Sequence, residues 1–180
     1  KRPIHFILTG GEFIYQYWLA IKTALKTQNG NIILHAYKEI KTDLDIEVRV
    51  IEIPKFKALQ GKPEHFVNAH TKDYLTYKIL YEEGGLCLDL DTVCLCDITG
   101  MIGEKDMMIP LDASVPCECP YNSAILEASK GSVVIKKALD MSMATLNNDN
   151  IEWGDTGPRL ISKIVEENRN SVIVPPFGVC

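Results

Sequence analysis

The stretch KDYLTYKILYEEGGLCLDLDTVCLCDI, residues 72–98, decides the fold of this chain. Apolar residues in its first part recur at helical spacing, and Gly84-Gly85 is a typical helix stop. The apolar run after these glycines predicts a buried strand that carries Asp89 and Asp91. Because alternate side chains of a strand share a face, we expect both carboxylates to point the same way.

Two carboxylates at this spacing repel each other unless a cation lies between them. A hard divalent cation, Mn²⁺ or Mg²⁺, suits carboxylate oxygens and keeps coordination positions open for substrate phosphates. Asp89 and Asp91 therefore predict a metal site. The plain alternative is that both side chains face solvent at the end of a strand, since acids two residues apart are common.

Strands and helices are expected to alternate on both sides of this stretch. The patterns predict strands at residues 4–8, 31–37, 48–53, 106–111, 123–126 and 172–174, and helices at 12–28, 132–146 and 155–168. Thr71 is a suitable N-cap for the helix that contains Asp73, and Asp155 for the last helix. Residues 92–98 are expected to continue as extended chain, whereas residues 55–68 give no clear pattern.

A chain of 180 residues without an internal repeat or linker predicts one mixed α/β domain, 1–180. We expect its first half, to about residue 98, to bind a nucleotide and its second half to face an acceptor. With 19 basic against 24 acidic residues, a net charge of −5 argues against a nucleic-acid or anionic-membrane partner. No apolar run is long enough to cross a bilayer, and no signal peptide is recognisable.

Cysteine usage favours a reduced, cytoplasmic protein. The six cysteines lie in a chain with much periodic apolar structure, unlike a small disulfide scaffold. Cys94-x-Cys96 and Cys117-x-Cys119 do not have the usual spacing of a zinc knuckle. We therefore expect no structural zinc.

The pair Asp89-x-Asp91 has two chemical interpretations. In the first, the acids hold a divalent cation that bridges the diphosphate of a nucleotide sugar and stabilises the leaving group. In the second, LCLDLDTV is the opening motif of a haloacid-dehalogenase-like phosphatase, with Asp89 as nucleophile and Asp91 as general acid. A phosphatase of this kind needs a later acidic pair, and Asp155 has no acidic partner before Glu166. We favour the first interpretation.

The residues from Asp73 to Asp91 resemble the signature of the DXD-containing glycosyltransferases, which include glycosyltransferase family 32. That signature runs Asp, two residues, Arg-Tyr, an apolar helix, Gly-Gly and the metal-binding acids. Residues 4–7, 122–125 and 156–158 resemble the family's opening strand, its asparagine-bearing strand and its Thr-Gly-Pro turn. Small transferases encoded by large algal viruses are similar in size, which would place such a protein in the host cytoplasm.

The resemblance implies a GT-A-like α/β fold, with a mixed, mainly parallel central sheet flanked by helices. It also implies a nucleotide-sugar donor, with UDP favoured, a hydroxyl acceptor on a glycan or other polymer, and Mn²⁺ or Mg²⁺. By position, Asp91 would bind the metal directly, and Asp89 would contact the ribose or the metal through water. Asp73 would accept hydrogen bonds from the donor sugar, and Thr9 and Gly10 would lie under the nucleoside.

One residue departs from the family signature. Thr76 stands where the family has an arginine, and a hydroxyl cannot copy a guanidinium fork. A donor with fewer hydroxyls than glucose, such as a deoxyhexose, would need fewer partners. Thr76 also leaves open an alternative, a nucleotide-sugar-binding module that has lost turnover.

Further candidates lie in the second half of the chain. Asp112 could take a proton from the acceptor hydroxyl. Asp155 either caps a helix or lies at a helix N-terminus that binds phosphate or acceptor, and Trp153 either stacks on a sugar or fills the core. The complete set of candidates is Asp112 and Asp155 for catalysis, Thr9, Gly10, Asp73, Thr76, Tyr77, Asp89, Asn122 and Gly157 for donor binding, and Asp89 and Asp91 for metal.

Overall fold

A seven-stranded sheet runs through the computed structural model, which describes residues 2–111 and 119–175. Its strands, in the spatial order β3-β2-β1-β4-β6-β5-β7, are β1 (Arg2–Leu8), β2 (Gly30–Ala36), β3 (Glu47–Val50), β4 (Gly85–Leu88), β5 (Met107–Met108), β6 (Ile125–Ala128) and β7 (Val172–Ile173). The helices are α1 (Tyr15–Thr27), α2 (Glu64–Glu83), α3 (Val133–Leu146) and α4 (Pro158–Glu167), with short 3₁₀ helices η1 (Lys57–Leu59) and η2 (Arg169–Ser171).

The sheet is mixed and mainly parallel, as expected. β1 pairs in parallel with β2 and β4, β2 with β3, and β5 with β7. β6 runs antiparallel to both of its neighbours, β4 and β5. Because β1 and β4 are parallel neighbours, the segments that follow them leave the sheet at the same edge.

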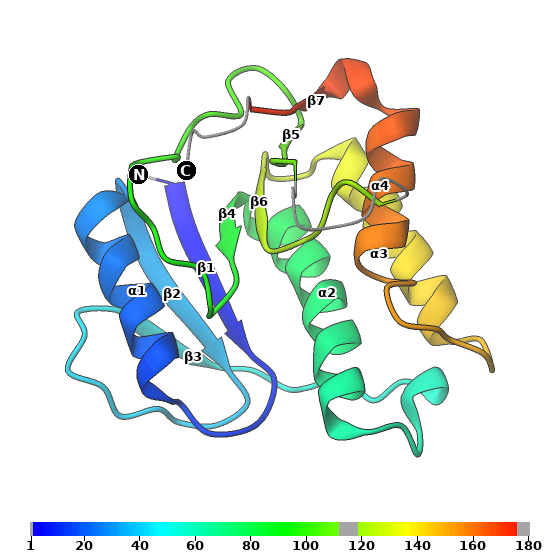
Figure 1. Cartoon of the computed structure of the whole chain (residues 1–180), viewed down its shortest axis with the longest axis horizontal. Helices are drawn as coiled ribbons and strands as arrows, with labels where there is room; N and C mark the ends of the chain where they lie inside the picture. Colours follow the sequence, from blue (N-terminus) through cyan, green and yellow to red (C-terminus); the bar gives the residue numbers. More distant parts are fainter. Residues whose placement is uncertain (1, 112–118, 176–180) are drawn as a thin grey trace.

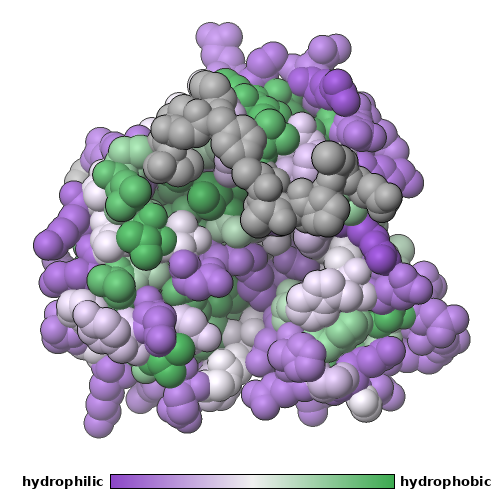
Figure 2. All heavy atoms as spheres, viewed as in Figure 1, coloured by the Kyte–Doolittle hydropathy of each residue, from purple (hydrophilic) through white to green (hydrophobic). Residues whose placement is uncertain are grey.

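Helices cover both faces of the sheet (Figure 1). α1 packs on the side of β1 that carries Phe6 and Leu8. α2, α3 and α4 pack on the other side, which carries Ile7. A strand buried on both faces reads as a continuous apolar run, which is why IHFIL identified β1. Figure 2 shows polar side chains gathered in the middle of this face of the molecule, with apolar ones on the side where α1 lies.

The central helix begins earlier than the sequence predicted. α2 starts at Glu64 after Pro63, so Thr71 is a fully buried residue of its interior and not its N-cap. Proline is tolerated at a helix start, and Glu64 in the first turn complements the helix dipole. Asp73 is therefore held by two preceding turns of helix rather than by a fraying end.

The acidic pair lies in a turn and not in a strand. β4 ends at Leu88, where its pairing with β6 ends, and Asp89 to Asp91 follow it. Residues 92–98, expected as extended chain, form no strand. This segment bonds to α1, since the Cys94 amide donates to Thr23 Oγ1 at 3.0 Å. The strand argument for a shared face therefore does not apply to the two acids.

The remaining elements lie close to their predicted places. α3 and α4 match the predicted helices, and Pro158 occupies the first turn of α4. Gly157 is the N-cap residue of α4, so the prediction that Asp155 caps this helix is wrong. The Asp155 carboxylate instead accepts from the Glu152 amide at 2.8 Å and closes the preceding turn. Among the described residues, no helix combines the length and apolar character needed to cross a membrane.

Candidate functional site

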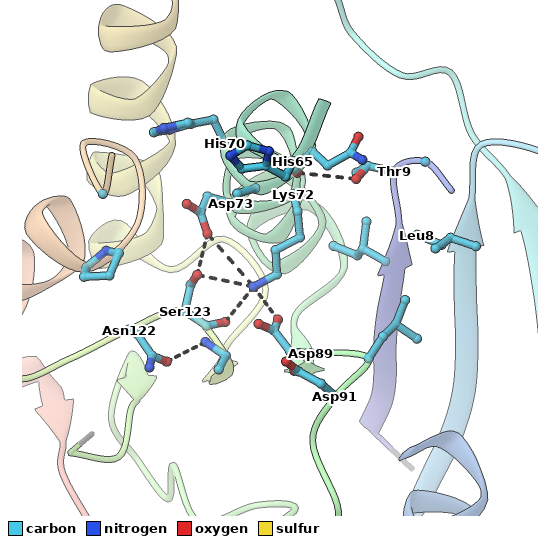
Figure 3. Close-up of a pocket in the computed structure, with 18 of the residues that line it drawn as sticks. Leu8, Thr9, His65, His70, Lys72, Asp73, Asp89, Asp91, Asn122 and Ser123 are labelled. Carbon is cyan, nitrogen blue, oxygen red and sulfur yellow. Dashed lines mark hydrogen bonds and ion pairs between the residues drawn. The ribbon is translucent and has the colours of Figure 1, made fainter. Parts of the chain in front are cut away.

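A cavity of about 700 Å³ opens where β1 and β4 end (Figure 3). Its walls come from the end of β1, the first half of α2, the turn after β4, the segment before β6 and the loop before α4. The described residues that line it are Ile7, Leu8, Thr9, Gly10, Tyr17, His65, Asn68, Ala69, His70, Lys72, Asp73, Asp89, Leu90, Asp91, Asn122, Ser123, Ala124, Trp153, Gly154 and Pro158.

Asp73 is the most firmly held acid of this cavity. It is 9% exposed, and its Oδ1 accepts from Ser123 Oγ at 2.5 Å while its Oδ2 accepts from Thr156 Oγ1 at 3.1 Å. Burial raises the pKa of Asp73 above its ordinary value, and Lys72 and the two hydroxyls oppose that rise. Gly157 leaves room for this carboxylate, since a Cβ there would lie 2.7 Å from Asp73 Oδ2.

Lys72 lies between the acids of α2 and those of the turn after β4. Its ammonium contacts Asp89 Oδ1, lies 4.0 Å from Asp73 Oδ1 and donates to Ser123 O and Oγ, each at 3.3 Å. Burial lowers the pKa of Lys72, but the charges of Asp89 and Asp73 outweigh burial and raise it above its ordinary value. Burial raises the pKa of Asp89, which Lys72 opposes, whereas Asp91 is exposed.

A hydrogen-bonded chain leads from Asp73 to His70. Because the Thr156 hydroxyl donates to Asp73 Oδ2, it can only accept at its 2.6 Å contact with His70 Nδ1. The network therefore assigns the proton of the neutral imidazole to Nδ1. Burial lowers the pKa of His70, which favours this neutral form. Tyr77 adds support from the core, since its hydroxyl donates to the Thr156 carbonyl oxygen at 2.8 Å.

Aromatic side chains form part of the cavity's edge. Trp153 is 58% exposed, so it does not fill the core, and its ring lies 5.8 Å from Phe66 and 6.2 Å from His65. His70 lies beneath it, with ring centroids 6.1 Å apart and nearly perpendicular planes. An exposed indole at the edge of a polar cavity offers a flat apolar face to a ligand.

Residues 16–110 match the model of a protein family described as "Glycosyltransferase sugar-binding region containing DXD motif", which spans more than half of the chain and includes all three cavity acids. The chain belongs to this glycosyltransferase family. No curated protein matches it. This membership favours the nucleotide-sugar interpretation of Asp89 and Asp91 over the phosphatase one.

A solved structure supports the fold assignment. The chain is similar to "PaToxG Glycosyltransferase" with a TM-score of 0.68 and 17% sequence identity, over 94% of this chain and 70% of that one. At this identity the similarity shows the fold alone. The glycosyltransferase therefore has the α/β, GT-A-like fold that its sequence predicted.

The fold brings most of the predicted site residues of this glycosyltransferase to one cavity. The lining includes Thr9, Gly10, Asp73, Asp89, Asp91 and Asn122. Gly157 does not line the cavity, but it backs Asp73 as described above.

Besides Gly157, three of the described predicted residues are not part of the lining. Thr76 is fully buried, with its Oγ1 3.6 Å from Cys87 Sγ, and Tyr77 is fully buried beneath Thr156. Asp155 forms an ion pair with Arg159 at 3.0 Å outside the lining. Asp112 lies outside the described residues.

Sequence reasoning missed Lys72, Ser123 and Thr156 as members of the site. A lysine next to an aspartate on a helix normally indicates a solvated face, so nothing local marks Lys72 as inward-facing. Its partners Asp89 and Ser123 come from the ends of other elements. The one signal in the sequence is that Lys72 lies one helical turn before Thr76. A cation therefore lies close to the position where the family signature has an arginine.

The acidic pair fits a hard divalent cation. Within residues 2–111 and 119–175, no group of three or more His, Cys, Asp or Glu side chains could hold an ion by itself. Asp91 is exposed, and Lys72 contacts Asp89 at Oδ1. One or two carboxylates, with the remaining positions left to water and phosphate, is the usual environment of Mg²⁺ at phosphate-transfer sites.

Proposed function

We propose that this glycosyltransferase moves a sugar from a UDP-linked donor to a hydroxyl group of a glycan or another polymer, with Mn²⁺ or Mg²⁺. The observation that carries the proposal is the convergence of Asp73, Asp89 and Asp91 on one open cavity at the end of β1 and β4. A volume of about 700 Å³ falls within the range of ligand cavities in proteins.

The charges of the cavity explain why a metal would be needed. Three carboxylates line it, and Lys72 is the only lysine or arginine among its described lining residues. A donor diphosphate is itself anionic, so it would be repelled by the uncompensated carboxylates. A divalent cation held by Asp91 and Asp89 would remove this repulsion, and when bound it would stabilise the charge of the departing diphosphate.

The remaining residues would bind and orient the donor. Each oxygen of Asp73 can accept one further hydrogen bond besides those from Ser123 and Thr156, which suits the hydroxyls of a sugar. Thr9 and Gly10 follow β1 and would lie under the nucleoside. Gly10 packs closely on Asn68, since a Cβ at Gly10 would lie 2.9 Å from Asn68 Oδ1. The absence of a side chain here suits a surface that lies under the nucleoside.

The donor sugar and the acceptor follow from two other features. Thr76 faces the core, so α2 offers no guanidinium to the donor. Among hexoses and deoxyhexoses, we therefore propose a donor sugar with fewer hydroxyls than glucose, such as a deoxyhexose. The exposed face of Trp153 suits a sugar ring of the acceptor. The lack of the arginine also favours a second candidate function, a nucleotide-sugar-binding module without turnover.

A donor panel tests this proposal. UDP- and GDP-linked hexoses and deoxyhexoses are incubated with the protein, Mn²⁺ and glycan acceptors, and the released nucleoside diphosphate is measured. Release of UDP would support the transferase, and a clear preference for glucose over the deoxyhexoses would contradict the sugar assignment. Mn²⁺-dependent thermal stabilisation by UDP without release would support the binding module. If the protein shows neither stabilisation by UDP nor release of UDP, both candidate functions are wrong.

A further inference from the structure

Lys72 is a buried cation within an acidic cavity. Its side chain is 16% exposed, although lysine side chains normally keep their ammonium in water. Its neighbours within the cavity are four oxygens: Asp89 Oδ1, Asp73 Oδ1 and the hydroxyl and carbonyl oxygens of Ser123. Figure 3 shows the ammonium pointing into the space that these residues enclose.

This arrangement gives the ammonium the surroundings of a hard metal ion. Carboxylate, hydroxyl and carbonyl oxygens are the ligands that hard divalent cations take from proteins. An ammonium satisfies the same oxygens with its three N–H donors. Ser123 links the two acids, because its hydroxyl also donates to Asp73 Oδ1 at 2.5 Å.

The ammonium has a reason to be there before any ligand binds. Asp73 is 9% exposed and the Oδ1 atom of Asp89 is buried, and buried carboxylate oxygens without a compensating charge destabilise a fold. Lys72 supplies that charge from the same turn of α2 that carries Asp73. A divalent cation that approaches Asp89 and Asp91 therefore meets a positive charge already bound to Asp89 Oδ1.

We propose that Lys72 is a built-in counter-ion that competes with the divalent cation for Asp89 and so weakens metal binding in the absence of donor. The inference rests on the proposed function, since it concerns the metal site of the same cavity. Asp91 then provides the direct protein ligand that Lys72 leaves free. A donor diphosphate offsets the crowding of positive charge, so metal and donor bind more tightly together than either does alone.

Mn²⁺ binding without nucleotide tests this competition. Mn²⁺ is titrated by calorimetry into the wild type, Lys72→Met, Lys72→Gln and the control Lys78→Met, which removes a charge from the same helix outside the cavity. We expect both neutral Lys72 variants to bind Mn²⁺ about tenfold more tightly than the wild type, about 1.4 kcal/mol. Lys78→Met should bind it as the wild type does. Equal, weaker or absent binding by the Lys72 variants overturns the proposal.

Stability measurements separate competition from a purely structural role. A structural ion pair predicts a lower melting temperature for Lys72→Met that Mn²⁺ does not repair, whereas competition predicts that Mn²⁺ restores it. Lys72→Gln keeps a hydrogen-bonding group for Asp89 and Ser123. If neither variant folds even with Mn²⁺, the proposal is wrong.

A separate UDP-release assay of the wild type distinguishes the two proposals. Release by the wild type without tighter Mn²⁺ binding by the variants refutes only the counter-ion role. Tighter Mn²⁺ binding by the variants, with no UDP binding or release by the wild type, refutes the transferase and supports the counter-ion.

Discussion

The buried end and the exposed rim of the cavity are built in different ways. At the buried end, both oxygens of Asp73 already accept hydrogen bonds, and His70, Thr156 and Lys72 continue the network. At the rim, Asp91 and Trp153 project from turns and are exposed. The buried end is thus formed before a ligand arrives, whereas the rim supplies exposed groups that are available to a ligand.

This difference suggests a division of labour. Preformed polar networks select a ligand by the shape of its hydrogen bonds, because their donors and acceptors cannot move to suit another one. Exposed carboxylates cost little to leave unpaired and can exchange water for a cation. Substitutions at the rim should therefore change activity without stability, and substitutions at the buried end should change both.

The largest effect is expected at the rim, for Asp91→Asn. Loss of the proposed metal ligand should lower turnover about a thousandfold, on the order of 4 kcal/mol of transition-state stabilisation. The free energy of unfolding should stay within about 0.5 kcal/mol, because the side chain is exposed. UDP release and chemical denaturation measure the two quantities. The control is Asp45→Asn, which changes an exposed acid outside the cavity. An equal loss of turnover in this control would show that the effect does not depend on the rim of the cavity.

At the buried end, Gly157→Ala should change both quantities. The new Cβ would lie 2.7 Å from Asp73 Oδ2, so the carboxylate or the turn must shift. We expect a stability loss of about 2 kcal/mol from this overpacking, together with a higher KM for donor. Denaturant unfolding and donor titration at saturating acceptor check it. An unchanged KM would mean that the buried end adapts to ligands as the rim does.

Trp153→Ala should affect only the acceptor. Removing the exposed indole should raise the KM for a glycan acceptor about tenfold, and leave the donor KM and the melting temperature unchanged. Tyr15→Ala removes an aromatic ring that is 70% exposed on α1 and provides a matched control. A fall in melting temperature for Trp153→Ala alone would show that the indole belongs to the buried network.

The sequence predicted the parts of this molecule that depend on local pattern. β1, α1, α3 and α4 follow from apolar spacing, and Asp73, Asp89 and Asp91 were placed together by resemblance to the family signature. The parts that failed depend on tertiary contacts. Residues 92–98 have the composition of a strand, but among the described residues they pair with no strand and bond to α1 through the Cys94 amide and Thr23 instead.

Lys72 shows the same limit within the site. Its sequence context is that of a solvated lysine, and only the fold brings Asp89 and Ser123 within reach of its ammonium. Thr76 is the reverse case, because its place in the signature predicted a donor contact that its burial against Cys87 does not provide. The sequence therefore shows which residues are present at this site, but not which way their side chains point.

The smallest effect concerns the pH dependence of the buried end. Burial holds the pKa of His70 below 6.5, so as the pH falls below that value the unfolded chain binds a proton that the folded protein does not. His70 should therefore make the free energy of unfolding fall with falling pH in this range. His70→Asn, which can still donate to Thr156, should flatten the slope, and His65→Asn at the exposed rim should not. Denaturant unfolding at several pH values measures the slopes, and identical slopes for wild type and His70→Asn would place His70 outside the preformed network.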